Sequence, residues 1–401
     1  MSDVESGRQM AFEWSNLSVA VPVKRKAHDA KVASGGGGGN PTQSSKSTRQ
    51  ILKPTSGLVS SGDVLAIMGP SGSGKTTLLD ALAGRMKLSC VSGSVTFGGK
   101  ALTEEERRMH VSYVAQEDSL MGVFTVRETV RMAVRFYHGY GLSGDDLEAL
   151  ESKVLTTVGL TSAANTIVGD IFRKGLSGGQ KRRLSLAVEL VKEPKVLILD
   201  EPTSGLDSAS AFGIMTSMTS LAKLGHTILC TIHQPSSDIW AVFDKFLLLS
   251  EGSTLYFGKA AEAVNYFGAL GHPCPQHCNP ADFFLGLVNT DFPLHSADLS
   301  KLEKAFSKST HIATDSSTPS NGAMLTSAGP KRTKACGPFA DFCTLSRRNI
   351  LNNLRNPGIF WVRFVMYAML SLMIGLMYRG LGDDKSGSVP PALAIDSRRT
   401  L

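Results

Sequence analysis

The chain has 401 residues, of which 42% are hydrophobic, 19% charged and 7% aromatic, and its mean hydropathy is +0.00. This composition excludes a largely disordered protein, and the length allows about two or three domains. A mean hydropathy near zero excludes a chain made mostly of membrane spans, although it does not exclude one span. The net charge of +7 is dispersed over short basic clusters such as 181–183, which we interpret as solvated faces. We therefore expect no nucleic-acid partner.

The first part of the chain is read as a tail, 1–10, and a strand-like run, 11–23, followed by a flexible insertion over 24–49 that contains a run of glycines. The tail has no apolar signal segment, which indicates a cytosolic, reduced start. From residue 51, short runs rich in branched residues alternate with helix-length patterns. This alternation predicts an α/β domain over 11–290, with a mostly parallel sheet and helices on both of its faces.

The predicted strands of this sheet are 63–69, 111–114, 195–199, 227–232 and 246–250. The predicted helices are 75–86, 125–138, 144–158, 179–192 and 209–224. Ser143 and Asp146 have the spacing of a capping box at the start of the third helix. Gly98-Gly99 has the composition of a hairpin turn, so a small antiparallel β-subdomain is expected beside the main sheet.

The C-terminal part is predicted to be a linker over 291–337, an amphipathic connecting helix over 338–357, a transmembrane helix over 358–379 and a polar tail over 380–401. Periodicity alone also allows the first helix to be a buried domain helix. The second is apolar for about twenty residues with one charge, Arg363, near its start, as in a span; the alternative is a buried core helix.

A glycine-rich turn follows the strand 63–69 directly and leads into an apolar helix, which is the context of a phosphate-binding loop. Backbone N–H groups of such a turn bind phosphates, the lysine reaches the β- and γ-phosphates, and the hydroxyl that follows it binds Mg²⁺. The candidate nucleotide-binding residues of this loop are Gly69, Pro70, Ser71, Gly72, Ser73, Gly74, Lys75, Thr76 and Thr77.

Asp200 and Glu201 follow the buried strand 195–199. Phosphoryl transfer to water needs one carboxylate to hold the metal and another to orient the attacking water, and these two acids suit the two roles in that order. The alternative is that the pair only caps the next helix, but the phosphate-binding loop would then lack a metal partner. The two motifs predict a site for a nucleotide and Mg²⁺.

A second candidate anion site lies at the start of the helix 179–192, in the run Leu176, Ser177, Gly178, Gly179 and Gln180. One chain already has a phosphate cradle, so a second is best explained if it binds the nucleotide held by another copy. With this run the sequence resembles the ATP-binding cassette (ABC) family, whose signature is LSGGQ.

The resemblance implies roles for three further residues. Gln116 matches the Q-loop that senses Mg²⁺, Asp207 matches the D-loop, and His233 matches the switch histidine that contacts the γ-phosphate. The runs 69–85, 231–237 and 279–282 are similar to the White-type half-transporters of the G subfamily. In that family an aromatic ring near the first strand stacks on adenine; this chain has Val19 there, with Phe12 and Trp14 as substitutes.

The resemblance also implies an ATP-hydrolysing half of an exporter, with ATP and Mg²⁺ as cofactors. Lys75, Glu201 and His233 would be catalytic, and Thr76, Gln116 and Asp200 would bind the metal. The implied partners are a second nucleotide-binding domain, from an identical or a related half-transporter, membrane lipid, and a hydrophobic substrate of the lipid, sterol or xenobiotic class. The implied location is a membrane, with the nucleotide domain in the cytoplasm.

Two alternatives remain open. Family members carry about six spans, so a chain with one favours a truncated product that binds ATP without transport. The other alternative is a soluble ABC-type ATPase that acts on nucleic acid or in translation; it predicts a second cassette, whereas this sequence carries one signature. A zinc site over 272–278 is disfavoured because its Cys and His residues lack a second CxxC pair.

Overall fold

The computed structural model describes residues 10–22, 48–139, 142–170, 173–289, 298–308 and 338–379. The predicted tails, nearly all of the insertion over 24–49 and most of the linker over 291–337 lie outside these ranges. The chain divides into two compact units, Met1–Cys336 and Gly337–Leu401, which are treated separately.

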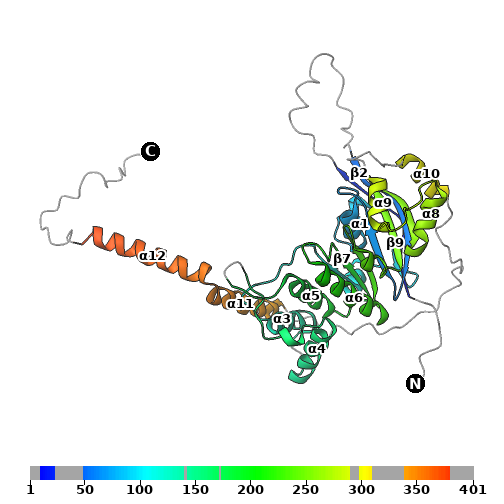
Figure 1. The fold of residues 1–401 in the computed structure, drawn as a ribbon. Coiled ribbons are helices and arrows are strands. Elements are labelled where there is room, and N and C mark those ends of the chain that lie inside the picture. The colour runs from blue at the N-terminus through cyan, green and yellow to red at the C-terminus, as the bar shows by residue number, and fades with distance from the viewer. Residues whose placement is uncertain are drawn as a thin grey trace, which may run out of the picture. The chain divides into compact units, whose positions relative to one another are not determined.

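A six-stranded sheet forms the centre of the first unit, with strand order β10-β9-β3-β8-β7-β6 (Figure 1). The neighbours from β9 to β6 pair in parallel, and β10 pairs antiparallel with β9 at one edge. The five parallel strands are those predicted from the sequence, while β10 was not anticipated. The strands are β3 (Val64–Met68), β6 (Val111–Val114), β7 (Val196–Leu199), β8 (Thr227–Thr231), β9 (Lys245–Ser250) and β10 (Ser253–Lys259).

A second, antiparallel sheet has the order β2-β1-β4-β5 and confirms the predicted β-subdomain. Gly98 and Gly99 form the predicted turn between β4 and β5, with φ of 58° and 78°. Positive φ at both central positions is the requirement of a type I′ hairpin, which glycine meets without steric cost. The strands are β1 (Ala11–Pro22), β2 (Thr48–Ser60), β4 (Val91–Phe97) and β5 (Lys100–Ala101), so the first residues of β2 fall in the stretch predicted as insertion.

All five predicted helices are present, with ends that differ by a few residues. The largest difference is at α1, which stops at Leu82 because Gly84 takes a φ of 70° just beyond its end. Ser143 caps α4 by accepting from the amide of Asp146. These helices are α1 (Lys75–Leu82), α3 (Val126–His138), α4 (Gly144–Thr157), α5 (Gly178–Leu190) and α6 (Ser208–Lys223); the additional ones are α2 (Glu104–His110), α7 (Ser237–Trp240), α8 (Ala263–Ala269) and α9 (Pro280–Val288).

The central sheet is buried on both faces, and β3 shows how its apolar run serves two cores. Val64, Ala66 and Met68 pack into one cluster with side chains of the helices α3 to α6, α8 and α9. Leu65 and Ile67 point the other way, into a cluster with α1 and the antiparallel sheet. Successive strand residues alternate between faces, so a strand covered on both sides must be continuously apolar.

Residues 299–308 correct the predicted linker, because they form a helix, α10 (Leu299–Lys308), that packs on the rest of the first unit. Leu302 is 3% exposed within the helical cluster. Glu303 binds the ammonium of Lys53 at 3.0 Å and accepts from the hydroxyl of Ser253 at 3.2 Å. The helix is short and its composition is polar, so its apolar positions were too few to identify it from the sequence.

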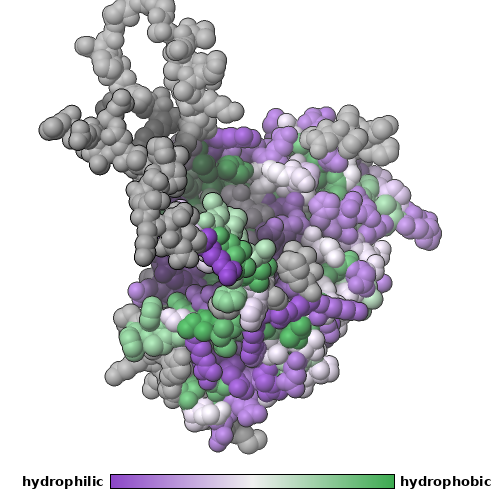
Figure 2. Space-filling view, turned by 90° about the vertical axis from the view of Figure 1, so that its left-hand side faces the viewer, coloured by the Kyte–Doolittle hydropathy of each residue, from purple (hydrophilic) through white to green (hydrophobic). Residues whose placement is uncertain are grey.

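The second unit contains α11 (Pro338–Arg355) and α12 (Pro357–Met377), which confirms the two predicted helices. Asn356 caps α12 through its side-chain oxygen, which accepts from the amide of Gly358 at 3.1 Å. Most of the exposed large hydrophobic side chains in the described ranges belong to these helices. On the face of the molecule drawn in Figure 2, hydrophobic groups lie among hydrophilic ones. Within the described ranges no helix is both long and apolar enough to cross a membrane, so the span predicted for 358–379 is not confirmed.

A buried carboxylate joins α3 to α4 in the first unit. Glu151 of α4 is completely buried, and its two oxygens accept from Arg127 at 2.6 Å and from Arg131 at 2.9 Å. Both arginines lie on α3 and are one third or more exposed. A buried carboxylate is tolerated when its oxygens are satisfied in this way.

We expect Glu151→Gln to lower the free energy of unfolding by about 1–3 kcal/mol, because an amide cannot accept from both guanidinium groups. The measurement is chemical denaturation of the full chain. Glu148→Gln, an exposed change on the same helix, is the matched control and should have little effect. Equal stabilities for the two variants would contradict the structural role of Glu151.

Candidate functional site

The glycine-rich turn connects β3 to α1 in a conformation that depends on glycine. Gly69 has a φ of 156°, and a Cβ there would lie 2.1 Å from the carbonyl oxygen of Leu249. Gly74, with a φ of 99°, is the N-cap of α1, and no side chain caps the first amides of the helix. A glycine-rich turn that leads to uncapped helix amides has the form of an anion site.

Lys75 lies at the start of α1 with 8% of its surface exposed, and its ammonium donates to the carbonyls of Gly69 at 2.7 Å and Pro70 at 2.9 Å. Burial lowers the pKa of Lys75, while the carboxylates of Glu201 and Asp200 act in the opposite direction. The hydroxyl of Ser73 is buried without a hydrogen-bond partner. A desolvated cation and an orphaned hydroxyl inside the turn fit a bound phosphate group.

Asp200 follows β7 and is held by side chains from the two neighbouring strands. Thr231, the last residue of β8, donates its hydroxyl to one carboxylate oxygen at 2.5 Å, and Tyr113 of β6 donates to the other at 3.2 Å. Burial, together with Asp200, raises the pKa of Tyr113, so the phenol keeps its proton and remains a donor. The carboxyl ends of three adjacent parallel strands therefore meet at Asp200.

Glu201 is positioned by the same threonine. Its backbone amide donates to the Thr231 hydroxyl at 2.8 Å, and its carboxylate accepts from the side-chain amide of Gln116 at 2.8 Å. Its φ is 45°, in the left-handed region that residues other than glycine rarely adopt. The structure thus brings Lys75, Gln116, Asp200 and Glu201 together at one edge of the sheet.

Arg182 corrects the prediction that 181–183 is a solvated basic face, because this residue of α5 is 6% exposed. Its guanidinium donates to the carbonyls of Ala115, Gln116 (3.2 Å) and Asp200 (2.6 Å), and it forms an ion pair with the carboxylate of Asp118 at 3.5 Å. This cation ties α5 to the loops after β6 and β7. Arg182 shares a buried face of α5 with Gly179 and Leu186, but no signal in the sequence distinguishes it from the other basic residues of its cluster.

The signature residues occupy the start of α5. Ser177 is the N-cap, and it forms a capping box with Gln180: each side chain accepts from the other residue's amide. Asp207 caps α6 by accepting from the amide of Ser210 at 3.1 Å, and hydrogen bonds to Ser210 lower its pKa. A Cβ on Gly179 would lie 3.2 Å from the Ser210 side chain, so these two helix starts are adjacent.

The signature is not joined to the phosphate-binding loop within this chain. Among the residues that the structure describes, no hydrogen bond or ion pair joins the signature run, 176–180, to the phosphate-binding loop, 69–77. Thr76 and His233 are both exposed, at the carboxyl-end edge of the sheet where β3 and β8 end.

The prediction that Phe12 or Trp14 stacks on adenine is wrong. Phe12 and Trp14 are fully buried in the core between the two sheets, where Trp14 packs edge-on against Phe257 at 5.6 Å. Val19 is likewise buried. Inward-facing positions of β1 supply the core, so none of the three presents a free face to a base.

The residues present suit Mg²⁺ better than a metal held by the protein alone. No group of three or more His, Cys, Asp or Glu side chains within the described ranges could hold a metal ion. Mg²⁺ usually takes one or two protein oxygens, and phosphates and water complete its shell. The hydroxyl of Thr76 and the carboxylate of Asp200 are of the right kind, and Gln116 retains its amide oxygen.

We expect Thr231→Val to lower the free energy of unfolding by about 1–3 kcal/mol, because it leaves the Asp200 oxygen and the Glu201 amide without a partner. Amide hydrogen exchange at Glu201 should rise. Thr227→Val, at the other end of β8, is the control, since the Thr227 hydroxyl is buried without a partner and its loss should cost nothing. Equal effects of the two changes would show that the Thr231 contacts add no stability.

Comparison with known proteins matches two stretches of the sequence to family models. Residues 52–204 match the model described as ABC transporter, and residues 233–301 match the one described as ABC-2 type transporter. ABC transporter G family member 13 of Arabidopsis thaliana is 34% identical over 84% of this chain and 55% of its own length. ABC transporter G family member 22 of Dictyostelium discoideum is 38% identical over 96% of this chain and 61% of its own length.

The chain thus spans about half to three fifths of the length of the curated relatives it matches. The family models cover the phosphate-binding loop, the signature and the acidic pair, and the relatives align with most of the described residues. The chain belongs to the ATP-binding cassette transporter family, in its G subfamily.

Proposed function

We propose that the chain is the ATP-binding and ATP-hydrolysing half of a membrane exporter. The observation that carries this proposal is the convergence of Lys75, Gln116, Asp200 and Glu201 at one sheet edge, beside a turn with an orphaned hydroxyl. Membership of the G subfamily of ABC transporters supports the coupling to transport.

Mg²⁺ and ATP, when bound, supply the γ-phosphate electrophile and neutralise its charge. With the nucleotide bound, Lys75 would exchange its carbonyl partners for phosphate oxygens, and Thr76 and Asp200 would hold the metal. Glu201 orients the attacking water and accepts its proton, while Gln116 holds that carboxylate in place at 2.8 Å. His233, exposed just beyond the end of β8, would contact the γ-phosphate.

The signature supports a functional dimer. Ser177 and the first amides of α5 form an anion site whose hydrogen bonds remain within its own helix. Ser177 would therefore serve the nucleotide held by a second nucleotide-binding domain, identical or related, and Asp207, at the adjacent start of α6, would lie at the same interface. Closure of the two domains on ATP moves the membrane segments.

The proposed substrates are hydrophobic molecules of the lipid, sterol or xenobiotic class, and the proposed location is a membrane with the nucleotide domain on the cytoplasmic side. Both rest on the resemblance to G-subfamily half-transporters.

We expect Glu201→Gln to lower ATP turnover by roughly a hundredfold or more, because the amide cannot accept a proton from the attacking water. Binding of ATP should persist, since Lys75 and the turn are unchanged. Phosphate release and equilibrium ATP binding measure the two quantities on the full chain. The control is Glu262→Gln, an exposed change, and near-normal turnover in Glu201→Gln would refute the assigned role.

A second expectation concerns the dimer. Ser177→Arg and Lys75→Met chains should each be inactive alone, whereas a co-expressed mixture should regain turnover. In the mixed dimer, the intact loop of the first chain faces the intact signature of the second. A mixture as inactive as its components, with mixed dimers shown by differential tags, would rule out the assignment across two chains.

A further inference from the structure

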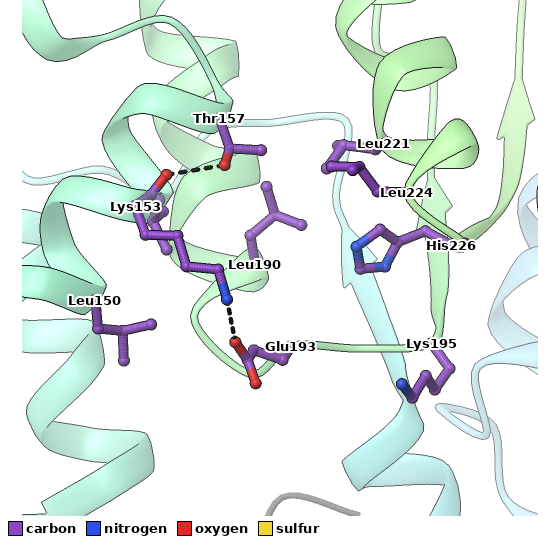
Figure 3. A pocket seen from close by; sticks show the side chains of 11 residues that line it. Leu150, Lys153, Thr157, Leu190, Glu193, Lys195, Leu221, Leu224 and His226 are labelled. Atoms are coloured by element: carbon purple, nitrogen blue, oxygen red, sulfur yellow. Dashed lines mark hydrogen bonds and ion pairs between the residues drawn. The ribbon is translucent and has the colours of Figure 1, made fainter. Parts of the chain in front are cut away.

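A pocket of about 290 Å³ lies at the amino-terminal edge of the sheet, away from Asp200 and Glu201 (Figure 3). Lys195 and His226, which line it, immediately precede β7 and β8. The candidate ATP site uses the other ends of these same strands. The pocket therefore belongs to a part of the nucleotide domain to which the proposed mechanism gives no role.

One side of the pocket is apolar. Leu150 and Val154 come from α4, Leu190 from the end of α5, and Leu221 from α6. Leu224 completes this wall beside Leu221 and is 73% exposed, which is unusual for so large an apolar side chain. An apolar body of a ligand would bury these side chains and gain stability from that burial.

The polar side of the pocket has an excess of positive charge. Lys153 is neutralised by Glu193, whose carboxylate lies 2.7 Å from its ammonium. Lys195 is exposed, and within the described ranges its ammonium has neither a hydrogen bond nor an ion pair. One cation of the pocket is therefore uncompensated, which favours an anionic ligand over a neutral or cationic one.

His226 adds a requirement for a hydrogen-bond donor. Its Nδ1 lies 2.7 Å from the carbonyl oxygen of Pro194, and a carbonyl only accepts, so Nδ1 carries the proton. Burial lowers the pKa of His226, which keeps the ring neutral and Nε2 an acceptor. The ring points into the pocket in Figure 3, and Nε2 has no partner among the described residues.

We propose that this pocket binds a small amphiphilic carboxylate with a hydroxyl or amide N–H group beside the carboxylate. The hydrocarbon chain lies against the leucines, the carboxylate pairs with Lys195, and the donor bonds to Nε2 of His226. Walls from α4, α5 and α6 surround the ligand, which therefore bridges the helices that flank the central sheet.

The test is photoaffinity labelling of the full chain with a diazirine analogue of decanoate, with labelled peptides located by mass spectrometry. Label should appear within 150–157 and 221–226. Competitors should displace it in the order 2-hydroxydecanoate, decanoate and methyl decanoate, because decanoate lacks the hydrogen-bond donor and the ester lacks both the donor and the negative charge. Equal competition by methyl decanoate and decanoate would overturn the proposal, and so would label confined to other peptides.

Two variants localise the effect. Lys195→Glu should reduce the label at these peptides by at least about fivefold, because the charge-assisted contact is lost. Leu224→Trp should reduce it by filling the apolar side from an exposed position. Lys87→Glu, with the same charge change at a distant exposed site, is the control and should label normally. Unchanged labelling of Lys195→Glu, with an unaltered thermal unfolding midpoint, would refute the pocket as the site.

Discussion

The guanidinium of Arg182 is a buried cation, and much of the site depends on how it is satisfied. Water is excluded from it, so the cost of burying the charge must be offset, and carbonyls from two loops together with the carboxylate of Asp118 supply the partners. One of these carbonyls belongs to Gln116 and another to Asp200, the residues whose side chains form the site. The helix that starts with the signature is thereby attached to the loops that would hold a metal ion and the attacking water.

The double-sided sheet makes this attachment possible. Strands buried on both faces leave their polar groups at their ends, and parallel pairing gathers the carboxyl ends of β6, β7 and β8 at one edge. Tyr113, Asp200 and Thr231 occupy equivalent places at that edge and bond to one another. A short hydrogen-bonded row across three strands then sets the position of the Glu201 backbone, while the exposed amide of Gln116 holds its carboxylate.

The sequence predicted the parallel strands, the main helices and the phosphate-binding loop because each depends on local patterns. Gly74 and Lys75 follow a continuous apolar run, and such a run has few alternatives to a buried strand. The hidden state of Arg182 was not predictable in this way, since a basic cluster normally faces water. Its burial depends on the carbonyls of Ala115 and Gln116, more than sixty residues away in the chain, and on that of Asp200, 18 residues away.

The prediction that an aromatic residue of β1 stacks on adenine failed for a related reason. Alternation along a strand shows that Phe12 and Trp14 share a face, but it does not show whether that face meets a ligand or another sheet. The six-stranded sheet covers that face. The helix α10 was missed because one strongly buried residue, Leu302, is too little signal in a polar segment. Long-range packing decides each of these cases.

The left-handed backbone of Glu201 means that a substitution at this position can affect stability and activity in opposite directions. Holding a glutamate at a φ of 45° costs about 1–2 kcal/mol, which glycine at the same position would not incur. A chain that exchanged the glutamate for glycine would lose its proposed water-orienting carboxylate and yet recover conformational free energy. Such a variant would reach a normal level in cells without hydrolysing ATP at the proposed site, so a measurement of protein abundance alone would not detect the defect.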